Sequence, residues 1–141
     1  MVTERSRRVL SPGKMFAGKF LLEENFAAGS MGSMWSARDT QRDIRVAIKV
    51  MASQISDSPG FVTRFEREAS AAAQIGSPHV VSIFEYGVHK ELPYIVMELL
   101  EGEDLHQRFK RETRLPLRST GRILRGICEG LHGAHEYGII H

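Results

Sequence analysis

The sequence predicts an α+β domain in which an antiparallel sheet is formed first and most helices follow it. Two observations predict this class. Short segments with alternating apolar residues, joined by brief polar turns, fill positions 20–51 and recur at 80–99. Segments with the apolar spacing of helices lie between and after them. No internal repeat interrupts this order, so the 141 residues are expected to form one domain or part of a larger one.

The composition excludes several classes of protein. Hydrophobic residues make up 42% of the chain, which is enough to build a core, and the net charge of +2 favours neither nucleic acid nor an anionic membrane as the main partner. No apolar run has the length of a membrane span, and no apolar segment follows the basic start as in a secretory signal. Cys128 is the only cysteine, which excludes an intrachain disulfide and fits a reducing, cytoplasmic location.

The first half of the chain is predicted to contain a flexible terminus and a three-stranded meander. Residues 1–13 are polar and basic and end in a Ser-Pro-Gly turn, which predicts a flexible N-terminal segment. Strands are expected at 20–28, 33–38 and 44–51. The glycine turn 29–32 and the polar turn 39–43 are short, so neighbouring strands are expected to run antiparallel.

A helix and two further strands are expected next. Ser58 and Pro59 supply a cap and a first-turn proline, and Gly76 is a stop signal. Between them, apolar residues recur at helical spacing at Phe61, Phe65, Ala69, Ala72 and Ile75. The two strands are expected at 80–86 and 93–99, joined by a polar turn at 87–92.

Two helices are predicted at the end, at 104–111 and 116–137. The second has an apolar stripe formed by Ile123, Leu124, Ile127, Cys128 and Leu131. On this stripe, Cys128 is expected to be a small core residue and not a reactive thiol. Four glycines each cost about 1 kcal/mol relative to alanine and count against an unbroken helix. They are Gly121, Gly126, Gly130 and Gly133.

Lys49 is the residue around which a functional site can be built. It lies in the third strand, on the same side as Ala47 and Met51. A lysine among apolar neighbours either extends its ammonium to water or meets an anion. The turn Gly29-x-x-Gly32 is either a plain tight turn or a loop whose backbone N–H groups approach a phosphate. It joins two strands, which disfavours a dinucleotide-binding fold, because that fold needs a helix after the glycines.

A buried lysine also needs a carboxylate partner. Glu68 is the candidate, because it follows Phe65 by three residues and therefore lies beside the apolar face of its helix. Glu66 points away from that face. Considered alone, Glu68 is equally well explained as a charge at the flank of the helix.

Four motifs in this order resemble the first part of a protein kinase domain. They are Gly29-x-x-Gly32-x-Met34, Val46-Ala47-Ile48-Lys49, Arg64-Phe65-x-x-Glu68-Ala69 and Ile95-Val96-Met97-Glu98-x-x-x-Gly102-x-Asp104-Leu105. The chain is most similar to the bacterial "eukaryotic-like" serine/threonine kinases. The resemblance implies a kinase N-lobe at 14–100, with a five-stranded antiparallel sheet, one helix, an ATP site and a hinge. Residues 101–141 would be the start of an incomplete C-lobe.

The resemblance also implies roles for individual residues. Lys49 would hold the α- and β-phosphates of ATP and Glu68 would pair with it, so these two would be catalytic. The loop over the phosphates would consist of Phe26, Ala27, Ala28, Gly29, Ser30, Met31 and Gly32. Adenine and ribose would contact Met34, Ala47, Met97, Glu98, Leu100 and Asp104. Among these, Met97 would be the gatekeeper and Asp104 would reach the ribose hydroxyls.

The sequence departs from the family pattern at several positions. Ala27 stands where the loop has its first glycine, and Met34 replaces a valine. His79 is shifted relative to the usual His-Pro-Asn and is expected to be structural. The final residues, 138–141, resemble the entry to the catalytic loop. The base aspartate and the magnesium ligands would follow it, so we expect no metal ligands within this chain and no phosphoryl transfer by the 141-residue polypeptide alone.

Two functions remain open from the sequence. The first is the ATP-binding part of a serine/threonine kinase that transfers the γ-phosphoryl of ATP to hydroxyls of a protein substrate, with the remainder of the C-lobe as a partner. The alternative is an inactive kinase-fold remnant that acts as a nucleotide- or partner-binding module. In either case later helices would normally cover the apolar stripe, so we expect it to be exposed in this chain.

Overall fold

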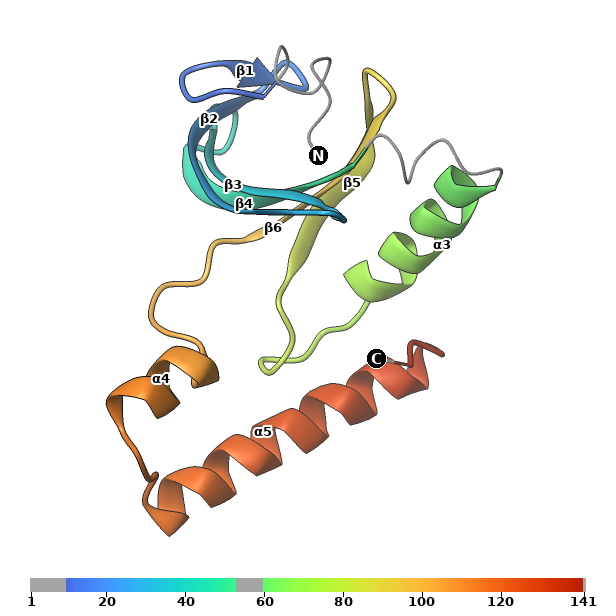
Figure 1. Cartoon of the computed structure of the whole chain (residues 1–141). Helices are drawn as coiled ribbons and strands as arrows, with labels where there is room; N and C mark the ends of the chain where they lie inside the picture. Colours follow the sequence, from blue (N-terminus) through green and yellow to red (C-terminus); the bar gives the residue numbers. More distant parts are fainter. Residues whose placement is uncertain (1–9, 53–59, 141) are drawn as a thin grey trace.

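The computed structural model describes residues 10–52 and 60–140, so the expected helix start at Ser58 and Pro59 lies outside the described residues. Figure 1 shows a curled sheet with helices beside it and below it. The predicted α+β class is confirmed.

In the described part of the chain, six strands form one antiparallel sheet. They are β1 (Met15–Phe16), β2 (Phe20–Gly29), β3 (Gly32–Asp39), β4 (Ile44–Met51), β5 (Ile83–His89) and β6 (Leu92–Glu98). Their order in the sheet is β1-β2-β3-β4-β6-β5, and each neighbouring pair is antiparallel. The five predicted strands are present. The sequence does not predict β1, because two residues are too few to show an alternation.

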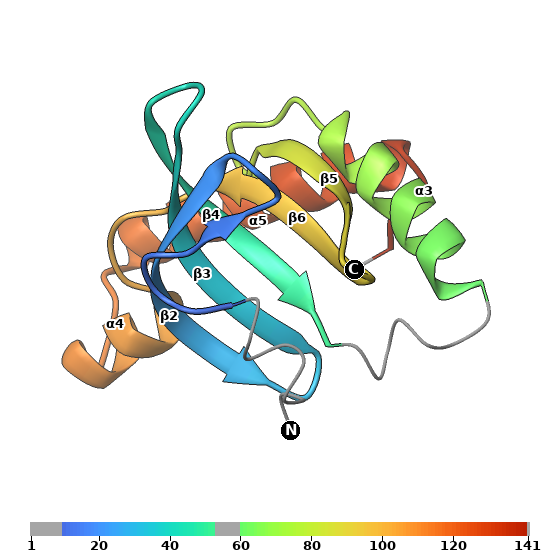
Figure 2. The same cartoon turned by 90° about the horizontal axis from the view of Figure 1, so that it is seen from above.

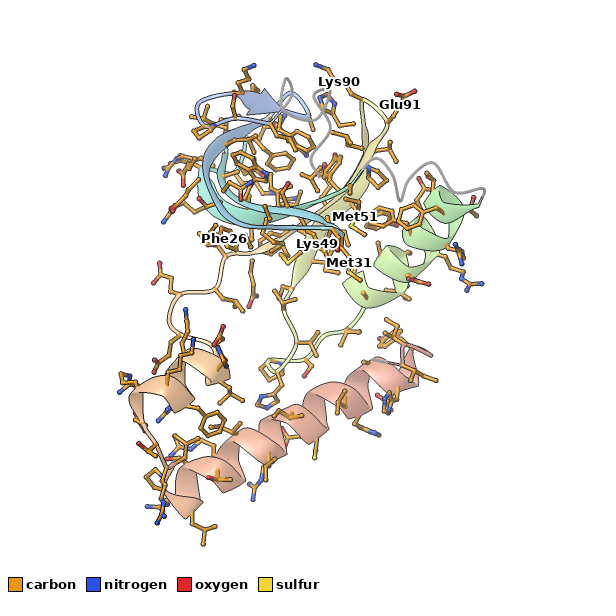
Figure 3. The ribbon with its side chains drawn as sticks, in the orientation of Figure 1. Phe26, Met31, Lys49, Met51, Lys90 and Glu91 are labelled. Atoms are coloured by element: carbon orange, nitrogen blue, oxygen red, sulfur yellow. The ribbon has the colours of Figure 1, made fainter. Side chains whose placement is uncertain are left out.

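The sheet buries one face in the core. Val46, Ile48 and Val50 of β4 are at most 1% exposed and pack in a cluster with residues of the other strands. Lys49 points to the opposite face, and Figure 3 shows it on the side of the sheet nearer to the helices α4 (Leu105–Arg111) and α5 (Leu117–Glu136). The alternation read from the sequence therefore places the core residues of β4 on one face and Lys49 on the other, as predicted.

Contacts with the sheet begin before residue 14, within the segment that the sequence predicts to be flexible. Leu10 is only 8% exposed and belongs to the core cluster, and the N–H of Gly13 donates to the carbonyl of Leu22 at 2.8 Å. Within the expected flexible segment, Leu10 is therefore packed in the core and Gly13 is hydrogen-bonded to β2.

Strand β5 starts and ends three residues later than the expected 80–86. At its start, the N–H of Val80 donates to the carbonyl of Ser77 at 3.2 Å and closes a turn. At its end, Lys90 and Glu91 have φ angles of 50° and 66° and form a two-residue hairpin. Neither residue is glycine, so the sequence carries no typical signal for this turn. Gly87, which was expected in the turn, lies within β5.

Three helices complete the fold within residues 10–52 and 60–140. Helix α3 (Phe61–Ala73) lies beside the β5 edge of the sheet, as Figure 2 shows, and buries Phe65 and Ala69. Helix α4 (Leu105–Arg111) begins at a capping box, in which Oδ1 of Asp104 accepts from the N–H of Gln107 at 2.7 Å. Helix α5 (Leu117–Glu136) is unbroken, in spite of its four glycines.

Two of the four glycines of α5 have a packing role. A Cβ at Gly126 would lie 3.0 Å from Nδ1 of His79, and one at Gly130 would lie 3.0 Å from the His79 carbonyl oxygen. Nε2 of His79 also lies 2.8 Å from Oε2 of Glu129. His79 therefore has the structural role expected for it, and the glycines let α5 approach the turn that follows α3.

The opposite side of α5 remains uncovered. Leu124, Ile127 and Leu131 are 56%, 45% and 37% exposed. Cys128 is exposed with them, so the prediction that it is a core residue is wrong for this structure. No helix within residues 10–52 and 60–140 is long and apolar enough to span a membrane.

Candidate functional site

Two adjoining cavities lie on the sheet face that carries Lys49. The first has a volume of about 280 Å³ and is lined by Ala27, Ala28, Gly29, Met31, Gly32, Ser33, Met34 and Lys49. The second has a volume of about 330 Å³ and is lined by Phe26, Met34, Ala47, Val81, Met97, Glu98, Leu99 and Leu100. Met34 lines both, so the two cavities are neighbours. The structure thus brings together most of the predicted site residues, from β2, β3, β4, β6 and the segment after β6.

The first cavity is lined both by the ammonium-bearing side chain of Lys49 and by residues of the glycine turn 29–32. Lys49 lies on β4 between Met34 of β3 and Ile95 of β6 and is half-buried. Within the described ranges, no ion pair joins its ammonium to a carboxylate. A half-buried ammonium without a protein counter-charge favours the binding of an anionic group.

The β2–β3 hairpin is held over the end of β4. The N–H of Ala52 donates to the carbonyl of Met31 at 3.1 Å, which anchors the tip of the hairpin. Gly32 has a φ of 140°, and a Cβ there would lie 2.1 Å from the carbonyl oxygen of Val50, so only glycine fits. A Cβ at Gly29 would meet no heavy atom within 4 Å, so a ligand can approach the backbone there.

A bulge in β2 directs Phe26 into the second cavity. The pairing of β2 with β3 shifts between Asn25 and Ala27, which leaves Phe26 as the extra residue. Its side chain is 49% exposed and lines the cavity, and Figure 3 shows it on the same side of the sheet as Lys49. Ala27, which replaces the usual glycine, lines the first cavity without closing it.

The second cavity is an apolar slot that is bordered on one edge by main-chain groups. Ala47 and Met97 are directly paired across β4 and β6 and form part of its wall. At its edge, the N–H of Glu98 donates to the carbonyl of Ser82 at 3.0 Å. The N–H of Glu98 is therefore not available to a ligand in this structure. Such a slot suits a flat, hydrogen-bonding ring.

Three predicted site residues do not line the cavities. Ser30 is exposed in the turn of the β2–β3 hairpin. Glu68 is exposed on α3, and in the described part of the chain no ion pair joins it to Lys49, so their pairing remains a prediction. Asp104 is exposed and uses Oδ1 to cap α4. Its other carboxylate oxygen has no hydrogen bond to the described residues.

The similarity to known proteins decides the family. Residues 20–141 match the protein kinase domain family. The chain belongs to this family. It is 36% identical over 134 residues to the serine/threonine-protein kinase PknA of Mycobacterium tuberculosis, covering 92% of this chain and 31% of that kinase. It is 35% identical over 133 residues to the probable serine/threonine-protein kinase pknA2 of Bifidobacterium longum, covering 92% of this chain and 18% of that protein.

Solved kinase structures show the same fold. The kinase domain of M. tuberculosis PknI, as a cysteine-to-alanine mutant, superposes with a TM-score of 0.82 at 25% identity, covering 94% of this chain and 54% of that chain. The kinase chain described here therefore spans about half of a solved kinase domain and less than a third of PknA and pknA2. The sequence-based prediction of a kinase N-lobe with the start of a C-lobe is confirmed at the level of family and fold.

The structure adds three cavity residues of this kinase chain that the sequence did not indicate, namely Ser33, Val81 and Leu99. Val81 follows the turn at 77–80 and reaches the slot only because β5 pairs with β6. No local pattern marks such a position. Leu99 lies between the predicted residues Glu98 and Leu100, and this position in the sequence is the signal that indicates it. Within residues 10–52 and 60–140, no group of three His, Cys, Asp or Glu side chains could hold a metal ion.

Proposed function

We propose that the two cavities bind ATP and that the chain is the nucleotide-binding part of a serine/threonine protein kinase. The complete enzyme would transfer the γ-phosphoryl of ATP to a serine or threonine hydroxyl of a protein substrate. The observation that carries this proposal is the junction of two cavities at Met34, one holding Lys49 under a hairpin and the other an apolar slot. ATP needs both environments at once, one for its phosphates and one for its base.

The phosphates would occupy the first cavity. Lys49 supplies a positive charge there, and the backbone N–H groups of residues 29–32 supply donors that approach closely because Gly29 has no side chain. Glu68 would pair with Lys49 and hold it in place. That pairing requires a different position of α3 or of the two side chains from the one in this structure.

The adenine would occupy the second cavity. Met34 and Phe26 would contact one face of the ring and Leu100 the other, while Met97 closes the back. The carbonyl of Glu98 would accept from the exocyclic amine, and the N–H of Leu100 would donate to a ring nitrogen. The free carboxylate oxygen of Asp104 would accept from a ribose hydroxyl.

Magnesium would assist the transfer with ligands from the remainder of the kinase domain. The family's base aspartate and metal-binding residues follow the position of His141, and this chain covers 54% of the PknI domain. We therefore propose that the rest of the C-lobe is a required partner and that transfer does not occur without it. A cytoplasmic location supplies ATP and suits the single cysteine. No observation favours the alternative of an inactive binding module.

The proposal predicts that Lys49→Met weakens nucleotide binding. We expect the affinity for a fluorescent ATP analogue to fall at least about tenfold, or about 1.4 kcal/mol, because the phosphates lose the cation that lines their cavity. Lys90→Met is the matched control, since Figure 3 shows Lys90 at the opposite end of the sheet from Lys49. Fluorescence titration of both variants gives the comparison. Equal affinities of the two variants for the ATP analogue would show that Lys49 does not contribute to nucleotide binding.

A further inference from the structure

Positive charge is concentrated in one stretch of the chain. Seven of the 19 basic residues but only one of the 17 acidic residues lie between Leu105 and Cys128. That stretch carries a formal charge of +6, and the rest of the chain carries −4. The nucleotide-binding proposal uses none of these seven side chains.

Three of the basic residues form a row on α5. Arg118, Arg122 and Arg125 recur at spacings of four and three residues, which places them on one face of the helix along about 10 Å. We call them the arginine row. All three are exposed, and in the described part of the chain none has an ion pair or hydrogen bond. Five other arginines do have a carboxylate partner, namely Arg38, Arg42, Arg45, Arg108 and Arg111.

This arrangement is unfavourable for the helix itself. Like charges three and four residues apart repel each other. Arg118 also lies in the first turn of α5, where the helix dipole is positive and no acidic residue is present. The first carboxylate along α5 is Glu129. On α3, by contrast, Arg64 and Arg67 alternate with glutamates. A bound anion would relieve the repulsion in the arginine row.

The arginine row is separate from the apolar stripe of α5. Leu124, Ile127 and Leu131 lie roughly 150° around the helix from the row. A segment that packs over the apolar stripe in a longer protein therefore leaves the row accessible. The glycines that contact His79 lie between these two faces, so the contact with the turn after α3 does not cover the row either.

We propose that the arginine row docks an acidic segment of a partner protein, bound in an extended conformation. Guanidinium groups match carboxylates with two parallel hydrogen bonds, which favours arginine over lysine at such a site. Side chains on one side of an extended chain repeat about every 6.6 Å, and successive arginines of the row are about 4.5–6 Å apart along the helix axis. Glutamates at alternate positions therefore match the row.

A membrane surface fits the row less well. A helix that lies in a bilayer interface inserts its apolar side and keeps flanking cations near the headgroups. With the apolar stripe of α5 inserted, the arginine row would point toward water. The proposed docking site is independent of ATP binding, so each proposal can fail without the other.

Fluorescence anisotropy with the full 141-residue chain tests the docking site. The probe is a fluorescein-labelled peptide with glutamate at every second position. The variant Arg118→Gln/Arg122→Gln/Arg125→Gln should bind it at least about tenfold more weakly than the wild type. The control Arg64→Gln/Arg67→Gln/Lys90→Gln removes the same charge from other exposed positions and should bind within about twofold of the wild type.

Three outcomes would overturn the proposal. One is equal weakening by the two triple variants, which would indicate a response to net charge alone. Another is equal wild-type affinity for a peptide in which glutamine replaces glutamate. The third is binding to phosphatidylserine vesicles that depends on the arginine row in the absence of peptide binding, which would assign the row to lipid.

A measurement on the wild-type chain avoids any effect of the substitutions on folding. Phenylglyoxal modifies accessible arginines, and mass spectrometry locates the modified positions. We expect the acidic peptide to protect Arg118, Arg122 and Arg125, while Arg64 and Arg67 react as before. Protection of all five to the same extent, or of none, would contradict a site on α5.

Discussion

A side chain at position 32 would collide with the backbone of β4, and this makes Gly32 the most restricted glycine of the hairpin. Its φ is 140°, and a Cβ at this position would lie 2.1 Å from the Val50 carbonyl oxygen. We expect Gly32→Ala to lower the free energy of unfolding by about 1–3 kcal/mol, measured by urea denaturation. Gly29→Ala is the control and should change it by less than about 0.5 kcal/mol, because no atom lies within 4 Å. Equal losses would show that the clash is relieved by a small shift.

Tyr94 is expected to make the stability of the sheet depend on alkaline pH. Its hydroxyl donates to Oε1 of Glu85 at 3.0 Å, and Glu85 also pairs with Lys19. Burial, that hydrogen bond and the charge of Glu85 raise the pKa of Tyr94 from 10.0 to about 12. The folded state therefore keeps its proton at pH values where the unfolded state has lost it, so the stabilisation is complete below pH about 10 and is lost as the pH rises through about 12.

The matching variant is Tyr94→Phe. Between pH about 10 and 12, the free energy of unfolding should fall more steeply in the wild type than in this variant, because only the wild type has the coupled proton. Urea denaturation at several pH values measures both slopes. Parallel curves would mean that the phenol is not held neutral by the fold.

At the scale of the elements, substitutions of two α5 glycines test whether the contact with His79 holds this helix in place. Gly121→Ala adds a Cβ in open space and should raise the free energy of unfolding by up to about 1 kcal/mol through helix propensity. Gly130→Ala adds one 3.0 Å from the carbonyl of His79, a backbone atom that cannot rotate away. We expect no gain in stability there, and faster amide exchange in residues 75–80. An equal rise in the free energy of unfolding at both positions would show that Gly130 is not packed closely against His79.

At the scale of the whole molecule, the open face of α5 is expected to cause self-association. Ile127 and Leu131 are 45% and 37% exposed, beside Leu124 at 56%. Ile127→Lys/Leu131→Lys should lower the fraction of oligomers in sedimentation velocity while changing the free energy of unfolding by less than about 1 kcal/mol. Met31→Lys, which changes an apolar residue exposed elsewhere, should leave association unchanged. A wild-type chain that is monomeric at high concentration would contradict this expectation.

The sequence by itself determined the features that depend on near neighbours along the chain. The alternation in β4 separates Val46 and Ile48 from Lys49 without reference to any other segment, and the capping residue Asp104 marks the start of α4. The order of motifs likewise identified the family, because each motif is continuous in sequence. These features are local, so short-range periodicity and spacing were enough to predict them.

Only the tertiary structure decided features that depend on contacts between distant segments. The bulge that turns Phe26 into the slot and the approach of α5 to His79 both depend on how elements pack. Cys128 has core-like spacing yet is exposed, because burial requires a second surface. A residue's own neighbours specify which side of a strand or helix it occupies, while the elements that pack there determine whether that side is core, site or surface.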